Sequence, residues 1–64
     1  MERFEVFMDS RGAIRWRLRD PGGETVATSE AYLSEQGCQN AIRAVKKFAP
    51  TAEVVDLTLV PSGK

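Results

Sequence analysis

Apolar and charged residues alternate without interruption over residues 14–19, which read Ile-Arg-Trp-Arg-Leu-Arg. In an extended chain successive side chains point to opposite faces, so this segment predicts a strand with three apolar side chains on one face and three arginines on the other. A second alternating segment, residues 4–8, is separated from it by the turn-prone residues 9–12. The pattern therefore predicts an antiparallel hairpin.

The register of this hairpin follows from its apolar face, because a slip of one residue would set arginines against the core. The register that keeps six apolar side chains together pairs Met8 with Ile14, Val6 with Trp16 and Phe4 with Leu18. On the other face it places Glu5 opposite Arg17, which predicts an ion pair. It also places Phe7 opposite Arg15, which predicts a cation–π contact.

A second turn at residues 20–23 (Asp-Pro-Gly-Gly) leads into a weaker strand, residues 24–28. This strand is expected to bring Val26 against Leu18 on the apolar face. The opposite face then holds small side chains that leave the arginines accessible, namely Thr25, Ala27 and Ser29.

Beyond Ser34 the apolar residues recur at the spacing of an amphipathic helix. They are Cys38, Ala41, Ile42, Val45, Phe48 and Ala49. Ser34 is expected to cap the helix, and Leu33 in front of it to pack onto Cys38. Pro50 ends the helix, because the residue before a proline avoids the α region.

Residues 53–60 are rich in β-branched side chains and place Val55, Leu57 and Leu59 on one side, so they predict a fourth strand. Residues 61–64 have no periodicity and are expected to form a disordered tail. The order β-β-β-α-β predicts an α+β fold, an antiparallel sheet with one packed helix, in a single domain of residues 1–60.

Size and composition limit how this domain is stabilised. A core in 64 residues seldom yields more than roughly 3–5 kcal/mol without disulfides, metal or a partner subunit. Cys38 is the single cysteine and histidine is absent, so neither an internal disulfide nor a zinc-type metal site is expected, and no cofactor either. Association with a second copy is therefore the remaining way to stabilise the fold.

Cysteine usage and hydropathy predict the compartment, and charge limits the partners. A lone cysteine suits a reducing compartment, and no apolar run approaches the ~20 residues that span a bilayer, so a cytoplasmic protein without membrane contact is expected. Nine basic residues balance nine acidic ones, which disfavours nucleic acid. Trp16 is expected on the core face, so Phe7 would be the single aromatic side chain on the arginine side for stacking on a base, where such surfaces typically present two or three.

Several segments together resemble the YegP-like family of small uncharacterised prokaryotic proteins. They are residues 4–7, 16–18, 27–32, 45–47 and 52–56, with Ser34, Cys38 and Ile42. The resemblance covers residues 3 to 58. It implies a β3-α-β unit and, for a chain with one unit, a homodimer whose single sheet forms by exchange of the last strands. It implies no activity and no catalytic residues.

The concentrated chemistry lies on the polar face of the hairpin. Arg15, Arg17 and Arg19, with Phe7 beside them and Arg3 opposite Arg19, form a row of guanidinium groups suited to phosphates or carboxylates. The simpler interpretation is a solvated outer face. We therefore hypothesise a non-enzymatic binding domain that contacts an acidic protein or an anionic ligand. The alternative is an accessory or stress-related structural protein without a ligand of its own.

The remaining candidates are more readily explained by packing. Cys38 lies in the first turns of the helix but on its apolar stripe, with no histidine to act as a base, so a core role is expected. Trp16 and Tyr32 are both expected in the core, with a groove or a dimer seam as the alternative place for the Tyr32 hydroxyl just before the helix. Gly37 within the helix indicates a close neighbour, most simply another strand. No nucleophile, base and orienting group occur together, which predicts a non-enzyme.

Overall fold

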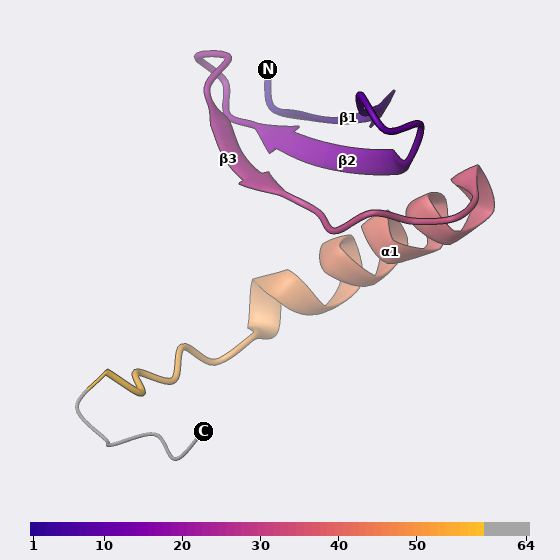
Figure 1. Ribbon diagram of the computed structural model, residues 1–64. Helices are drawn as coiled ribbons and strands as arrows, with labels where there is room; N and C mark the ends of the chain where they lie inside the picture. The colour runs from indigo at the N-terminus through magenta and orange to yellow at the C-terminus, as the bar shows by residue number, and fades with distance from the viewer. Residues whose placement is uncertain (59–64) are drawn as a thin grey trace.

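The computed structural model describes residues 1–58 and contains a three-stranded sheet and one long helix. The elements are β1 (Arg3–Met8), β2 (Ile14–Arg19), β3 (Thr25–Thr28), α1 (Glu35–Phe48) and a short 3-10 turn, η1 (Ala49–Thr51). The strands are antiparallel in the order β1-β2-β3, and α1 crosses one face of the sheet (Figure 1). This part of the predicted α+β fold is confirmed.

The hairpin of β1 and β2 has the predicted register at every position. Val6 lies opposite Trp16, and Glu5 lies opposite Arg17. The turn between the strands is closed by Asp9, whose Oδ1 accepts hydrogen bonds from the backbone N–H groups of Arg11 and Ala13, both at 2.9 Å. Alternation and turn chemistry agree here, and together they specify the pairing.

The register of β3 differs from the prediction by one residue. Arg19 pairs with Thr25 as expected, but a β-bulge follows, and Ala27 instead of Val26 lies opposite Leu18. The extra residue shifts the rest of the strand, so Val26 is exposed and Thr28 faces Arg17. The expected contact of Val26 with Leu18 and the expected place of Ala27 among the arginines are therefore wrong.

Residues 29–32 continue along β2 and guide the chain toward α1. The Ser29 N–H donates to the carbonyl of Trp16, and the Trp16 N–H donates in return to Ser29 Oγ, each at 2.9 Å. Ile14 and Tyr32 then exchange two backbone hydrogen bonds as an isolated bridge. Ser29 thus extends the pairing of β2 beyond the end of β3.

The start of α1 is only partly as predicted. Ser34 is the N-cap, and its Oγ accepts from the Gly37 N–H at 3.1 Å. Leu33 is fully exposed, so the expected packing onto Cys38 is wrong. Leu33 belongs to the loop that leaves the Ile14–Tyr32 bridge, and this path turns its side chain to solvent. At the other end, Phe48 is the last helical residue before η1, which contains Pro50.

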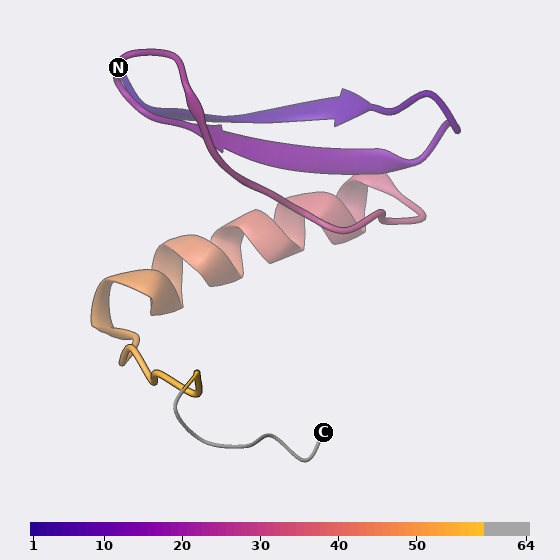
Figure 2. The same ribbon diagram turned by 60° about the vertical axis from the view of Figure 1, so that its left-hand side comes forward.

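The core is small and is centred on one residue of β2. Trp16, Cys38 and Ile42 are the buried apolar residues of the described chain, and Phe4 packs edge-on against Trp16 with ring centroids 5.4 Å apart. The helix lies against β2 (Figure 2). Consequently the apolar face of β1 is uncovered at Val6 and Met8, as is Phe48 at the end of α1.

The expected fourth strand is absent from residues 53–58. This segment forms no strand and runs away from the sheet after η1 (Figures 1 and 2). Its apolar side chains are open to solvent, with exposed fractions of 93% for Val54, 63% for Val55 and 66% for Leu57. A strand needs a neighbour for its backbone groups, and none of the described strands lies beside it. The last two residues of the predicted strand and the predicted tail, 61–64, lie outside the described residues.

Gly37→Ala is expected to stabilise an isolated subunit. An added Cβ would lie 3.5 Å from Ser34 Oγ and 3.9 Å from Tyr32 Cδ1, which is ordinary contact, and so the predicted close strand is not among the residues described. Alanine gains up to ~1 kcal/mol over glycine inside a helix, equivalent to about 4–8 °C in Tm. Thermal unfolding by circular dichroism checks this. A lower Tm would show that another chain approaches Gly37 in solution.

Candidate anion-binding face

The outward face of β1 and β2, here called the arginine face, gathers four guanidinium groups around two carboxylates. The arginines are Arg3, Arg15, Arg17 and Arg19, and the carboxylates are Glu5 and Asp9. The alternation of both strands sends these side chains to the side opposite α1. The structure thus brings together all three arginines predicted from β2, with Phe7 among them.

Glu5 is the centre of this face. Its Oε1 accepts from Arg17 Nε at 2.7 Å and from Arg19 Nε at 2.9 Å, and its Oε2 lies 2.7 Å from an Arg3 terminal nitrogen. The hydrogen bonds from Arg17, then those from Arg19 and Arg3, lower the pKa of Glu5 from 4.5 to about 2. The predicted ion pair of Glu5 with Arg17 is confirmed, and it belongs to a larger network.

The depressed pKa of Glu5 makes stability depend on acid. A carboxylate with a lower pKa in the folded state contributes stability that is complete above its ordinary pKa and is lost as pH falls from 4.5 toward about 2. The urea midpoint of the wild type is therefore expected to fall across this window, and Glu5→Gln should flatten the fall. The urea midpoint of Glu5→Gln should still fall somewhat with pH, because the pKa of Asp9 is also lowered. Equal slopes for both proteins would contradict this network.

Asp9 holds the other end of the face. Its Oδ2 accepts from Arg15 Nε at 2.9 Å, while its Oδ1 closes the hairpin turn. The Ala13 N–H is the main cause of its lowered pKa, followed by Arg11 and Arg15. The turn role of Asp9 is readable from sequence, but its pairing with Arg15 is not, because the reach of a long side chain decides it.

Phe7 stacks with a different arginine from the one expected. The guanidinium carbon of Arg17 lies 4.4 Å from the Phe7 ring centroid, whereas Arg15 is drawn to Asp9. The expected contact with Arg15 is therefore wrong. Stacking on Phe7 fixes the plane of the Arg17 guanidinium. Its Nε donates to Glu5, and its two terminal nitrogens have no hydrogen-bond partner among residues 1–58.

The other two arginines of β2 use a terminal nitrogen internally. Arg19 donates to the carbonyl of Gly23 at 2.9 Å and to Thr25 Oγ1 at 3.2 Å, and Arg15 donates to the carbonyl of Ser29 at 3.4 Å. These bonds hold the forks in place. With four arginines and two carboxylates the face carries a net charge of about +2, and its guanidinium donors are already oriented, which is the chemistry that recognition of an anion requires.

The aromatic and thiol candidates belong to the core. Trp16 is buried, and its Nε1 has no hydrogen-bond partner within residues 1–58. Tyr32 is half-buried against the same cluster. Cys38 is fully buried, and burial, with a smaller effect of Glu35, raises the pKa of its thiol. A thiol in this state is a poor nucleophile, as expected for a packing role.

Residues 1–58 contain neither a clustered metal site nor a membrane-spanning helix. This part of the chain contains no group of three or more histidine, cysteine, aspartate or glutamate side chains placed to hold a metal ion. None of its helices has both the length and the apolar character needed to cross a bilayer.

Comparison with known proteins identifies the family. The pattern of the domain of unknown function DUF1508 matches residues 9–56. A UPF0339 protein of Methanosarcina acetivorans is 44% identical over 57 residues, covering 89% of this chain and 98% of its own.

Two solution structures share the fold. A protein of Agrobacterium tumefaciens is 34% identical with a TM-score of 0.82, covering 97% of this chain and 100% of its own. A protein of Haloferax volcanii is 39% identical with a TM-score of 0.79, covering 86% of this chain and 93% of its own. The chain therefore belongs to the uncharacterised DUF1508 (UPF0339) family of small prokaryotic proteins, and the resemblance to the YegP-like family is confirmed.

Proposed function

We propose that this protein is a non-enzymatic binding module whose arginine face binds an acidic protein segment or another anionic ligand. The observation that supports it most is the oriented guanidinium of Arg17, whose terminal nitrogens have no hydrogen-bond partner within residues 1–58, on a face that keeps a net charge of about +2. A fork whose plane is fixed loses little side-chain entropy when it binds a carboxylate or phosphate. A cytoplasmic location, where acidic proteins and polyphosphates are both present, suits this role.

A non-enzymatic role is supported by the state of the chemical groups. The chain lacks histidine, and its one thiol is buried with a raised pKa. The two carboxylates of the arginine face have lowered pKa values and already accept several hydrogen bonds, so neither is poised as a base near neutral pH. These groups suit recognition of charge better than proton transfer.

We further propose that the module acts as a homodimer in which the C-terminal segments are exchanged, as the family resemblance implies. Three buried apolar residues make a very small core for the described chain, whereas Val54, Val55 and Leu57 expose a run of apolar surface. β1 also presents an unpaired strand edge. A second copy would cover both, which supports association.

The experiment that tests the binding role is a titration of the protein with inorganic polyphosphate, RNA and an acidic peptide. The triple variant Arg15→Ala, Arg17→Ala, Arg19→Ala is expected to lose at least about tenfold in affinity for the bound anion, since each charge-assisted contact is worth roughly 1.5–3 kcal/mol. The matched control removes three cations from α1 instead, as Arg43→Ala, Lys46→Ala, Lys47→Ala, and should change affinity much less.

In the same titration, Glu5→Gln is expected to change anion affinity in the opposite direction from the triple variant. It removes the carboxylate that three guanidinium groups share while the arginines stay, so anion affinity is expected to rise. Affinities that are equal in the wild type, the triple variant and Glu5→Gln would contradict the binding role. That result would favour the second candidate, an accessory structural protein, which the internal pairing of the arginines also fits.

A further inference from the structure

We propose that the arginine face recognises an extended acidic segment of another protein, in which two carboxylate side chains separated by one residue bind Arg17 and Arg19. This inference rests on the binding role proposed above. It deepens that role by naming one chemical class of ligand, the spacing of its charges and the residues that bind them. We assign the Thr28 hydroxyl, beside Arg17, to the same site.

The positive charge of the arginine face is concentrated at one end of β2. Three guanidinium groups share the carboxylate of Glu5, so a net charge of about +2 remains around it. At the other end, Arg15 and Asp9 form a pair 2.9 Å apart and neutralise each other. An anion is therefore attracted to the end that carries Arg17 and Arg19 more than to the end that carries Arg15.

Terminal guanidinium nitrogens are the donors that remain at this end. Arg17 and Arg19 both donate from Nε to Glu5, and Arg17 uses neither terminal nitrogen within residues 1–58. Arg19 uses one of its two, which donates to the carbonyl of Gly23 and to the Thr25 hydroxyl. Each of the two guanidinium groups therefore has a donor for one further carboxylate.

Thr28 adds a hydroxyl donor next to Arg17. The two residues lie directly opposite each other in the pairing of β2 with β3, so their side chains share a face of the sheet. Thr28 is exposed, so its hydroxyl is accessible to a ligand. A carboxylate at this point can accept from the Arg17 guanidinium and from the Thr28 hydroxyl together.

The spacing of the two arginines matches that of an extended ligand. Arg17 and Arg19 are two residues apart on one strand, so their Cα atoms are about 6.6–6.8 Å apart. An extended peptide has the same two-residue repeat and turns alternate side chains to the same side, so carboxylates at positions i and i+2 face both arginines at once. Adjacent acidic side chains point to opposite sides, and only one of them reaches the face.

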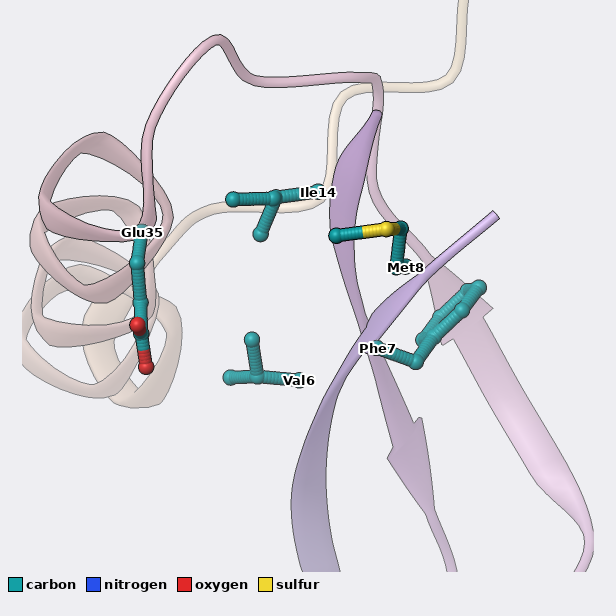
Figure 3. A pocket seen from close by; sticks show the side chains of 5 residues that line it. All are labelled: Val6, Phe7, Met8, Ile14 and Glu35. Carbon is teal, nitrogen blue, oxygen red and sulfur yellow. The ribbon is translucent and has the colours of Figure 1, made fainter. Parts of the chain in front are cut away.

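The surface beside these arginines leaves room for such a segment. On the side of β3 the outward residues are Thr25 and Thr28, which are short and exposed. On the side of β1, Phe7 points away from Val6 and Ile14, so the arginine face is separate from the hollow that those two residues line between β1 and the start of α1 (Figure 3). An extended segment can lie along β2 over the short side chains of β3.

Nucleic acid fits the same charges less well. Single-stranded nucleic acid is bound by stacking of its bases on exposed aromatic rings. The Phe7 ring is already stacked with Arg17, whose guanidinium carbon lies 4.4 Å from its centroid, and Trp16 is buried. The whole chain has no net charge, so it lacks the long-range attraction that binding of a phosphate backbone uses. A short acidic protein segment needs only the local charge.

Titration of the full chain with three peptides of equal charge tests the spacing. Each is a short Gly-Ser peptide with two aspartates, placed next to each other, separated by one residue or separated by three, and binding is followed by two-dimensional ¹⁵N NMR. The peptide whose aspartates are separated by one residue is expected to bind at least about threefold more tightly than the others. It should shift the Nε–H signals of Arg17 and Arg19 more than that of Arg15.

Arg17→Lys distinguishes recognition by the guanidinium from attraction of charge alone. It keeps the charge, removes the planar pair of donors and should weaken binding of this peptide at least about threefold. Arg15→Lys is the matched control, because Asp9 neutralises Arg15, and it should change the affinity less than about twofold. Thr28→Val should also weaken binding, whereas Thr51→Val, the same change in η1, should leave it unchanged.

Equal affinity for the three peptides, or equal effects of the two lysine variants, would overturn this inference and leave the proposed binding role standing. Tightest binding of the peptide with three intervening residues would do the same, because that spacing matches a helix. Binding of RNA or inorganic polyphosphate without binding of any peptide would also overturn only this inference. If peptides, RNA and polyphosphate all fail to bind, the binding role itself is overturned.

Discussion

Replacing Trp16 with alanine is expected to leave the chain largely unfolded at 25 °C. Trp16 is 8% exposed, joins the buried Cys38 and Ile42 of α1 and carries the edge-on contact with Phe4. Truncating a buried aromatic to alanine typically costs 3–5 kcal/mol. That is about the whole stability that a core of this size supplies, so the loss is close to complete.

Urea unfolding followed by far-ultraviolet circular dichroism checks this expectation. Phe48→Ala is the matched control, because Phe48 is an aromatic residue that is 60% exposed at the end of α1, and its removal should change stability by no more than about 0.5 kcal/mol. A Trp16→Ala protein with a wild-type midpoint would show that the fold is held by something other than this core.

Placing carboxylates on the apolar side of the C-terminal segment is expected to have the second largest effect. In the double variant Val55→Asp, Leu57→Asp, two charges would have to enter the apolar contact that the proposed exchanged dimer gives this segment, and burying unpaired charges costs several kcal/mol. The self-association constant should fall at least a hundredfold. Analytical ultracentrifugation across a concentration series measures this loss.

The control for this experiment is Val26→Asp, which adds a carboxylate at another exposed apolar position, in β3. Its self-association should stay within a few-fold of wild type. If the double variant associates as well as the wild type, the apolar side of residues 53–58 is not an interface, and the exposed Val55 and Leu57 have another explanation.

Local patterns predicted the elements that local chemistry determines. The hairpin register follows from strict alternation, the N-cap from Ser34, and the helix end from Pro50. The bulge in β3 was not predictable, because alternation over four residues hardly distinguishes Val26 from Ala27 as the partner of Leu18. The exposure of Leu33 depends on the path of a loop, which no periodicity encodes.

In the site, too, strand alternation predicts which side chains share a face, but it does not predict which of them form contacts. That three arginines share a face with Phe7 follows from alternation, and the structure places them there. Which carboxylate each guanidinium binds depends on long flexible side chains, so the pairing of Arg15 with Asp9 was missed, as was the stacking of Arg17 on Phe7. Residues 53–58 form no strand, because a strand forms only beside a partner strand and none of the described strands lies next to them.

Sedimentation equilibrium of the full chain at micromolar concentration tests the central claim, that one chain is an incomplete unit completed by a second copy. We predict a folded species of twice the 7.1 kDa mass of one chain. A folded, stable species with the mass of a single chain would contradict it.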